Sequence, residues 1–445
     1  MKAALLLGAL AACTGDIGTL HVQVATAPDS TLADDVQHLR ATLTDPPTVV
    51  DADKQDGGFA LDLEVDAEGI TGYVELEGFD AGDQRIAFGR SGPLPIAAID
   101  ATITIYLGAP MSVQEAPVRL EPVRSAMGVT PLSYGVLYAG GTDGAGDPSN
   151  ELAIYNVYDH DLQQGDDMPA QRSAPVAMAG SQGKVFVFGG ADADGQPTAD
   201  LFYFDTNVAP AGAWYQLDSD DALARAGADV APVGGDFFLV TGDPVAAIDG
   251  VTGRAAAIDL APGPLVGTAT SVLISDVVNT LIAGDGAGVT GATLYALGTF
   301  VSLDQAPSEI ARTGHGAAAL ANGDIAIVGG RTLAGLPASA VRYQIRTRGF
   351  TVVDDVLATP RIDAAVASTA DYLIVAGGRD QSDQVLGDAE VLDASTLQPV
   401  TILPLLVPRT GASAEALPNG QILIAGGVDA AGAPITTLEL FTPDR

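Results

Sequence analysis

A sequence unit that recurs through most of this 445-residue chain limits its possible folds more than any other feature. The clearest copies begin with Arg312-Thr313-Gly314 and Arg409-Thr410-Gly411, and each copy ends in a pair of glycines. Paired glycines start at 140, 189, 329, 377 and 426, so adjacent copies lie 48 or 49 residues apart. The stretch from 189 to 329 has room for three units, of which two degenerate ones end at Thr241-Gly242 and Ala283-Gly284. Seven units predict a repeat architecture in which neighbours bury a shared core.

The copy that begins at Arg312 predicts four β-strands. Its first run, as far as Leu320, is rich in glycine and alanine, as expected of strands that lie close together around the axis of a ring. Asn322-Gly323 predicts a two-residue hairpin turn, and the apolar run after it predicts a strand buried between neighbouring sheets. Gly329-Gly330 allows a sharp exit that a Cβ would obstruct. Alternating runs at 340–345 and 350–353 supply the third and fourth strands.

These units resemble the kelch repeat, which has four strands per blade of a β-propeller. The resemblance implies an all-β fold with a seven-bladed propeller over residues 116–445. The last unit lacks a fourth strand before Arg445, and the segment 116–122 has the pattern of one. We therefore expect that segment to close the ring, which removes open sheet edges. Kelch units usually carry a tryptophan between the third and fourth strands, but Trp214 is the only tryptophan here.

Residues 1–12 have the pattern of a signal peptide. Met1-Lys2 supplies the positive start, and the apolar run that follows is too short to span a bilayer. Leu10-Ala11-Ala12-Cys13 resembles the lipobox of bacterial lipoproteins. That resemblance implies that Cys13, the only cysteine, carries diacylglycerol and that its new N-terminus is acylated, which anchors the protein in the cell envelope. Thr14 follows where an inner-membrane lipoprotein would have Asp, so we expect the outer membrane, facing either the periplasm or the surface.

Residues 13–115 form a different region, without the repeated unit. Short runs such as Leu20 to Val24 and Ala101 to Leu107 alternate apolar and polar residues and are separated by Asp/Gly turns. This period of two predicts strands with one buried face. The region is expected to be a small N-terminal β-sandwich.

The charge of the chain excludes one class of partner. Lys and Arg total 20 against 56 Asp and Glu, which gives a formal net charge of −36. A field of this sign repels phosphate backbones, so we expect no nucleic acid partner. The acidity by itself indicates a soluble surface.

Six arginines hold one equivalent position in the repeat, just before the innermost strand. They are Arg124, Arg172, Arg225, Arg312, Arg361 and Arg409. In a closed propeller they would surround one mouth of the central channel and form a site for an acidic glycan or an acidic peptide. The alternative is structural: each arginine bonds loop carbonyls or an Asp of a neighbouring blade, and recurrence in nearly every repeat favours this role.

Catalytic and metal-binding patterns are absent from the sequence. Its 4 histidines have no metal-ligand spacing, so we expect no metal or cofactor. Copper enzymes of the galactose oxidase type share the kelch propeller, but they need a cysteine that lipidation of Cys13 removes. Several units carry an Asp soon after the paired glycines, and we interpret these residues as turn formers rather than calcium ligands. They are Asp143, Asp192, Asp380 and Asp429.

Two functions remain open. The first is a non-catalytic lipoprotein whose propeller binds a protein or glycan partner. The second is a carbohydrate-active hydrolase or lyase that uses carboxylates at the channel mouth. A mouth lined by alanine and backbone would favour the first, and paired carboxylates beside the arginines would favour the second.

Overall fold

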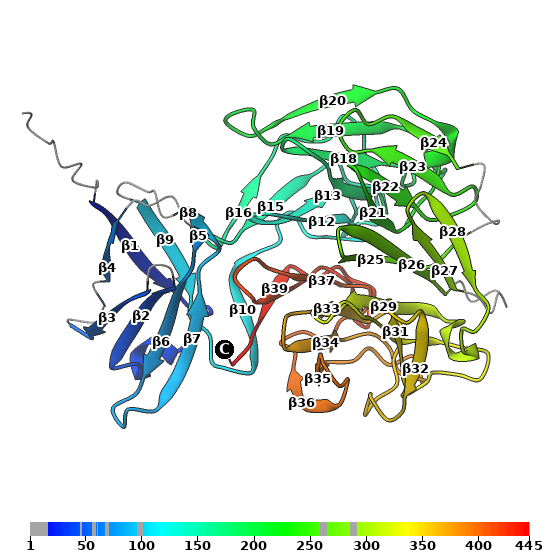
Figure 1. Ribbon diagram of the computed structural model, residues 1–445. Helices are drawn as coiled ribbons and strands as arrows, with labels where there is room; N and C mark the ends of the chain where they lie inside the picture. Colours follow the sequence, from blue (N-terminus) through cyan, green and yellow to red (C-terminus); the bar gives the residue numbers. More distant parts are fainter. Residues whose placement is uncertain are drawn as a thin grey trace, which may run out of the picture.

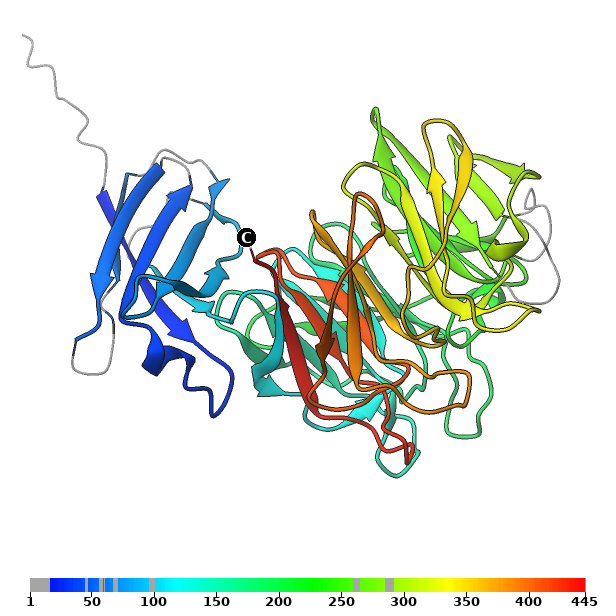
Figure 2. The same cartoon turned by 90° about the horizontal axis from the view of Figure 1, so that it is seen from below.

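The computed structural model describes residues 17–44, 47–55, 59, 61–66, 71–95, 101–258, 265–284 and 292–444. The protein is all-β, with small N-terminal sheets beside a larger body of repeated sheets (Figures 1 and 2). Helical structure is limited to α1 (Leu32–Asp35) and the 3₁₀ turns η1 (Asp221–Leu223) and η2 (Ser308–Ile310). Over the described ranges, no helix has the length and apolar character needed to cross a membrane. Cys13 and the predicted signal peptide lie outside these ranges.

Two N-terminal sheets share one hydrophobic core. The first has the order β4-β1-β9 and comprises β1 (Ile17–Ala25), β4 (Asp62–Asp66) and β9 (Ala101–Tyr106). It is mixed, because β1 pairs antiparallel with β4 and parallel with β9. The second has the order β3-β2-β6-β7 and comprises β2 (His38–Thr44), β3 (Pro47–Asp53), β6 (Val74–Phe79) and β7 (Arg85–Arg90). A small pair is formed by β5 (Thr71–Gly72) and β8 (Leu94–Pro95).

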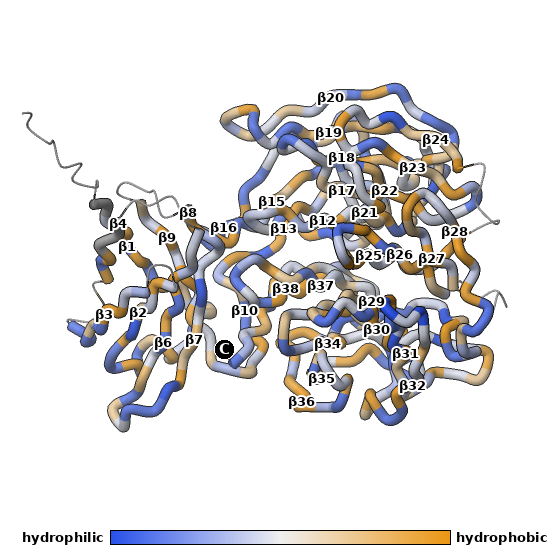
Figure 3. The backbone as a smooth tube through the Cα atoms, viewed as in Figure 1, coloured by the Kyte–Doolittle hydropathy of each residue, from blue (hydrophilic) through white to orange (hydrophobic). Residues whose placement is uncertain are grey.

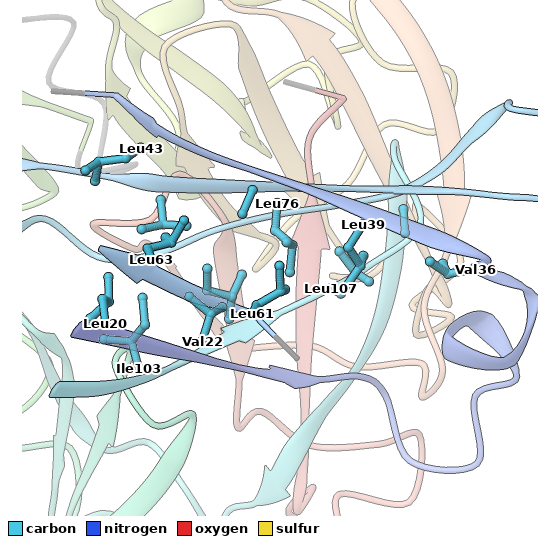
Figure 4. Close-up of a cluster of buried hydrophobic side chains, with 14 residues drawn as sticks. Leu20, Val22, Val36, Leu39, Leu43, Leu61, Leu63, Leu76, Ile103 and Leu107 are labelled. Carbon is cyan, nitrogen blue, oxygen red and sulfur yellow. The ribbon is translucent and has the colours of Figure 1, made fainter. Parts of the chain in front are cut away.

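The alternating apolar residues of these strands fill that core, as their period of two predicts. Leu20 and Ile103 come from the mixed sheet, whereas Leu39 and Leu76 come from the four-stranded sheet (Figure 4). All four are less than 6% exposed.

Seven four-stranded antiparallel sheets make up the larger body, and we number them 1 to 7 in chain order. Sheet 1 comprises β12 (Gly128–Leu132), β13 (Gly135–Ala139), β15 (Leu152–Asn156) and β16 (Asp161–Gln164). Sheet 2 comprises β17 (Val176–Ala179), β18 (Lys184–Phe188), β19 (Leu201–Asp205) and β20 (Ala213–Leu217). Sheet 3 comprises β21 (Val230–Gly234), β22 (Phe237–Val240), β23 (Ala246–Asp249) and β24 (Ala255–Ala257). Sheet 4 comprises β25 (Thr268–Ile274), β26 (Val277–Ala283), β27 (Ala292–Ala296) and β28 (Thr299–Leu303).

The remaining sheets include the clearest copies of the repeat. Sheet 5 comprises β29 (Thr313–Ala319), β30 (Ile325–Arg331), β31 (Ala340–Gln344) and β32 (Gly349–Val353). Sheet 6 comprises β33 (Ala365–Ser368), β34 (Tyr372–Ala376), β35 (Asp388–Asp393) and β36 (Pro399–Pro404). Sheet 7 comprises β37 (Ser413–Ala416), β38 (Ile422–Ala425), β39 (Thr437–Thr442) and β10 (Ser112–Arg119). A separate short pair is formed by β11 (Arg124–Ser125) and β14 (Thr142–Asp143).

The first strands of the seven sheets contact one another in order. Contacts run from β12 through β17, β21, β25, β29 and β33 to β37, and β37 also contacts β12. This circular arrangement of sheets is consistent with the blades of a propeller (Figure 1). The two degenerate units form four-stranded sheets like the others.

Sheet 7 joins the two ends of the repeated region. Its outer strand β10 pairs antiparallel with β39, from Ser112 opposite Thr442 to Arg119 opposite Thr437. The sequence analysis expected the segment 116–122 in this place, but the strand begins at Ser112 and ends at Arg119. A register shift between Glu115 and Arg119 bends the strand within that segment.

The second strands of the clear repeats are buried along most or all of their length. Every residue of β13 and of β38 is buried, and so are the first six residues of β30. These strands face neighbouring sheets on both sides, which explains their continuous hydrophobic pattern (Figure 3).

Candidate functional site

Five of the six repeat arginines are buried, and Arg225 is partly exposed. Arg124, Arg312, Arg361 and Arg409 are 0% exposed, and Arg172 is 7% exposed. This burial differs from the open channel mouth at which the sequence analysis expected them. The physical reason is that their guanidinium groups find acceptors within the protein.

Arg361 shows these acceptors most completely. Its Nη1 donates to the carbonyl of Gly377 at 3.1 Å and to Asp388 Oδ1 at 3.0 Å. Its Nη2 donates to Glu390 Oε1 at 2.6 Å. The Glu390 carboxylate also accepts the N–H of Thr359 at 2.9 Å, so one buried ion pair fixes the loop before β33.

Arg409 repeats the same arrangement in sheet 7. It donates to the carbonyl of Gly426 at 3.2 Å, to that of Thr437 at 3.1 Å, and to the carboxylate of Glu439. Glu390 and Glu439 lie at equivalent places in the third strands β35 and β39. Each carboxylate thus comes from the arginine's own sheet, not from a neighbouring one.

The other arginines also donate to loop groups. Arg312 donates to the carbonyls of Gly329 at 2.8 Å and Ser339 at 3.0 Å. Arg225 donates to Thr241 O at 2.6 Å, Arg172 pairs with Asp200, and Arg124 donates to Pro122 O. Bonds to loop carbonyls and to an Asp are what the structural role of these arginines predicted.

The arginine backbone also links neighbouring sheets. The carbonyl of Arg361 accepts the N–H of Gly330 in sheet 5, and the carbonyl of Arg409 accepts the N–H of Gly378 in sheet 6, both at 2.8 Å. Gly330 has a φ of 82° and Gly378 one of 92°, which explains the second glycine of each pair. Arginine and paired glycines thus form one joint between adjacent sheets.

A ring of left-handed residues lies two positions after the arginines. Its members have φ between 46° and 65°, and we call them the mouth rim: Ala126, Ala174, Gly227, Gly314, Asp363 and Gly411. Backbone hydrogen bonds join rim residues of adjacent sheets. Ala174 N–H donates to Ala126 O at 2.9 Å and Gly227 N–H to Ala174 O at 3.0 Å. On the other side, Asp363 N–H donates to Gly314 O at 2.8 Å and Gly411 N–H to Asp363 O at 2.9 Å.

Two adjoining cavities open beside the mouth rim. The first has a volume of about 390 Å³, and its lining includes Asp229, Thr268 and Thr313. The second has a volume of about 400 Å³, and its lining includes Asp363, Arg379, Thr410 and Gly411. Gly314 and His315 belong to both. The repeat arginines Arg225 and Arg312 also line the first cavity, and the remaining lining of both cavities is largely glycine, alanine and threonine.

Two carboxyl groups of the repeated region have raised pKa values. Burial raises the pKa of Asp229 to about 6, and burial together with the charge of Asp229 raises that of Glu415 to about 7. Asp229 accepts the N–H groups of Val230 and Ala269, both at 2.8 Å, and thereby joins sheet 3 to sheet 4. Glu415 lies on the first strand β37.

His315 is held neutral in the wall between the cavities. Burial, followed by the charge of Arg312, lowers the pKa of His315 to about 4. Its Nε2 lies 2.9 Å from the hydroxyl of Thr268. From the sequence, His315 was only one of four histidines without metal-ligand spacing.

The Asp residues after the paired glycines form turns, as predicted. Oδ1 of Asp380 accepts the N–H groups of Ser382 at 2.8 Å and Gln384 at 2.9 Å. The same two bonds occur at the other three turns, those of Asp143, Asp192 and Asp429. Each carboxylate caps its own backbone. Within the part of the chain that the structure describes, no group of three or more His, Cys, Asp or Glu side chains is arranged to hold a metal ion.

Sequence reasoning missed the mouth rim, Asp229 and the partners of the arginines. A signal for the rim was present, since Gly227, Gly314 and Gly411 each follow a repeat arginine by two residues. The pairing of Arg361 with Glu390 had no local signal, because it depends on the register of three strands.

No protein-family model matches the chain, and no curated protein matches it either.

Proposed function

We propose that this chain is a lipid-anchored cell-envelope protein whose seven sheets form a kelch-like β-propeller that binds a protein or glycan partner. The N-terminal sheets form a β-sandwich that separates the propeller from the membrane. The anchor is Cys13, and the proposal assigns it to the outer membrane. Support for the anchor comes from the lipobox pattern of residues 10–13. The binding function is non-catalytic.

The two adjoining cavities at the mouth rim carry the binding proposal. Their volumes of about 390 and 400 Å³ fall within the range of ligand sites. Their small side chains leave backbone groups within reach of a ligand, and the hydrogen-bonded rim supplies a rigid edge. Gly314 and His315 border both cavities, so one extended ligand can occupy the two.

The proposal does not depend on the repeat arginines, although Arg225 and Arg312 line the first cavity. Arg361 and Arg409 already bind carbonyls and buried carboxylates. An acidic partner also has to approach a chain with a net charge of −36. We therefore place the partner against the mouth rim.

A carbohydrate-active hydrolase or lyase is the second candidate, and the pair of Asp229 and Glu415 favours it. Acid–base cleavage of a glycosidic bond uses two carboxyl groups, of which one has a raised pKa. Against it, both Asp229 oxygens accept backbone N–H groups, which is a structural use. Turnover of chromogenic glycosides by the protein, abolished in Glu415→Gln, would establish the enzyme and displace the non-catalytic proposal.

A matched pair of threonine substitutions tests the binding site. Thr313 is exposed and lines the first cavity, whereas Thr347 is exposed at the opposite end of sheet 5, between β31 and β32. The soluble protein starting at Gly15 is screened on glycan and peptide arrays. We expect Thr313→Trp to lose most of the binding and Thr347→Trp to retain it. Equal binding by both variants would place the partner elsewhere on the protein.

A further inference from the structure

Asp363 is the exception on the mouth rim. The other five rim positions hold alanine or glycine, and only Asp363 brings a charged side chain to the rim. A residue with a Cβ is disfavoured at its φ of 56°, although Asp tolerates this conformation better than most. The alanines at 126 and 174 prove that the rim does not need a carboxylate.

The Asp363 carboxylate lies against a glycine of the next sheet. A Cβ at Gly314 would come within 2.4 Å of Asp363 Oδ1, so the absence of a side chain at Gly314 makes room for the carboxylate. Asp363 is half-buried and lines the second cavity. Over the ranges that the structure describes, no hydrogen bond or ion pair reaches its carboxylate, unlike those of Asp380 and Glu390.

Two further polar groups of the second cavity lack partners. Thr410 is 3% exposed, and its Oγ1 has no hydrogen-bond partner among the described groups. Nε of Arg379 likewise has none in the described structure, while its Nη1 lies 3.4 Å from Asp383. Asp363 and Arg379 form no ion pair within 4.0 Å in the described ranges. One cavity thus brings together a carboxylate, a hydroxyl and a guanidinium group with unused bonding capacity.

We propose that the second cavity binds a neutral saccharide, held by Asp363, Arg379 and Thr410. This inference rests on the proposed binding function and names its ligand. Sugar hydroxyls both donate and accept hydrogen bonds, so one ligand satisfies a carboxylate and a guanidinium group together. A basic peptide would be repelled by the positive charge of Arg379. An acidic glycan would be repelled by Asp363 and by the net charge of −36. A neutral polyhydroxyl ligand avoids both repulsions.

The test measures binding of neutral glucose-, galactose- and mannose-based di- and trisaccharides by titration calorimetry. The test variant is Asp363→Ala, since alanine occupies the same backbone conformation at 126 and 174. The control is Asp324→Ala, which removes one carboxylate from the turn between β29 and β30 at the opposite end of sheet 5. Loss of hydrogen bonds to a charged group predicts about ten- to one-hundred-fold weaker binding by Asp363→Ala. Asp324→Ala should bind as the parent protein does.

The outcomes separate this inference from the proposed function. If no neutral saccharide binds but a peptide or an acidic glycan binds and is lost in Thr313→Trp, the saccharide assignment is overturned and the binding site stands. Saccharide binding that is unchanged in Asp363→Ala also overturns the inference. If no array ligand depends on Thr313 or on Asp363, both proposals fail.

Discussion

The backbone N–H of Tyr106 donates a hydrogen bond to Nε2 of His160 at 3.2 Å, and this bond joins the N-terminal sheets to sheet 1. Tyr106 ends β9, whereas His160 lies in the turn between β15 and β16. His160 Nδ1 lies 2.7 Å from the hydroxyl of Tyr155. Because Nε2 accepts a hydrogen bond, the ring is neutral and Nδ1 carries its proton.

The hydrogen bonds of His160 predict that the folded protein loses stability in acid. Burial lowers the pKa of His160 from 6.5 to about 4. Since the unfolded chain binds this proton first, the stability contributed by neutral His160 is complete above pH 6.5 and is lost as the pH falls toward 4. The lowered pKa of His160 corresponds to about 3 kcal/mol in the free energy of unfolding. Urea unfolding followed by Trp214 fluorescence at several pH values should give a flatter acid dependence for His160→Gln than for the parent protein.

The control for this measurement is His21→Gln, because the His21 side chain is 51% exposed. It should keep the parental dependence on pH. An unchanged acid dependence in His160→Gln would show that the junction does not sense protons.

The buried pair of Arg361 and Glu390 predicts a large loss of stability when one partner is removed. Arg361→Met leaves a buried carboxylate without its cation, which should cost about 3–5 kcal/mol in the free energy of unfolding. Arg346→Met, at an exposed position, should change it by less than about 0.5 kcal/mol. The double variant with Glu390→Met should recover part of the loss, because no unpaired charge remains. A small effect of Arg361→Met in urea titrations would contradict the structural role.

The paired glycines predict unequal effects of alanine. A Cβ at Gly378 would lie 2.6 Å from the carbonyl of Ile362, whereas a Cβ at Gly432 meets nothing within 4 Å. Both glycines have a positive φ, 92° at Gly378 and 80° at Gly432. Gly432→Ala should therefore lower stability only by the backbone strain of about 1–2 kcal/mol. Gly378→Ala should lower it further, and equal melting temperatures of the two variants would disprove the close approach.

Lipidation of Cys13 predicts that the protein leaves the membrane fraction when this cysteine is replaced. In a bacterial host, the full chain should incorporate labelled palmitate and fractionate with membranes, whereas Cys13→Ala should do neither. Cys13 is the only cysteine, so no other thiol can take the label. Label or membrane association that persists in Cys13→Ala would exclude this anchor.

The repeat was predictable because each sheet is encoded locally. The hairpin signal at Asn322-Gly323 and the buried run after it need only neighbouring residues, and sheet 5 has a hairpin and a buried strand there. The turn is longer than the predicted two residues, because Leu320 and Asp324 are the pair that closes it, and Gly323 has a positive φ whereas Asn322 does not. The site was less predictable because its contacts cross between sheets. Asp229 precedes sheet 3 and accepts the N–H of Ala269 in sheet 4, and no local pattern contains that contact. Arg361 is buried together with Glu390, which accepts a hydrogen bond from its guanidinium group. Glu390 lies in β35, 29 residues further along the chain, so no short sequence motif contains both residues.

Strand β10 has a consequence for the biosynthesis of this protein. It is translated before sheets 1 to 6, yet its partner β39 ends the repeated region. Residues 120–436 must be made in between, and at roughly 5–20 residues per second the delay is on the order of half a minute. Throughout that interval the nascent chain carries an unpaired edge strand, so a chaperone that shields β10 would serve this protein until synthesis of its final strand releases it.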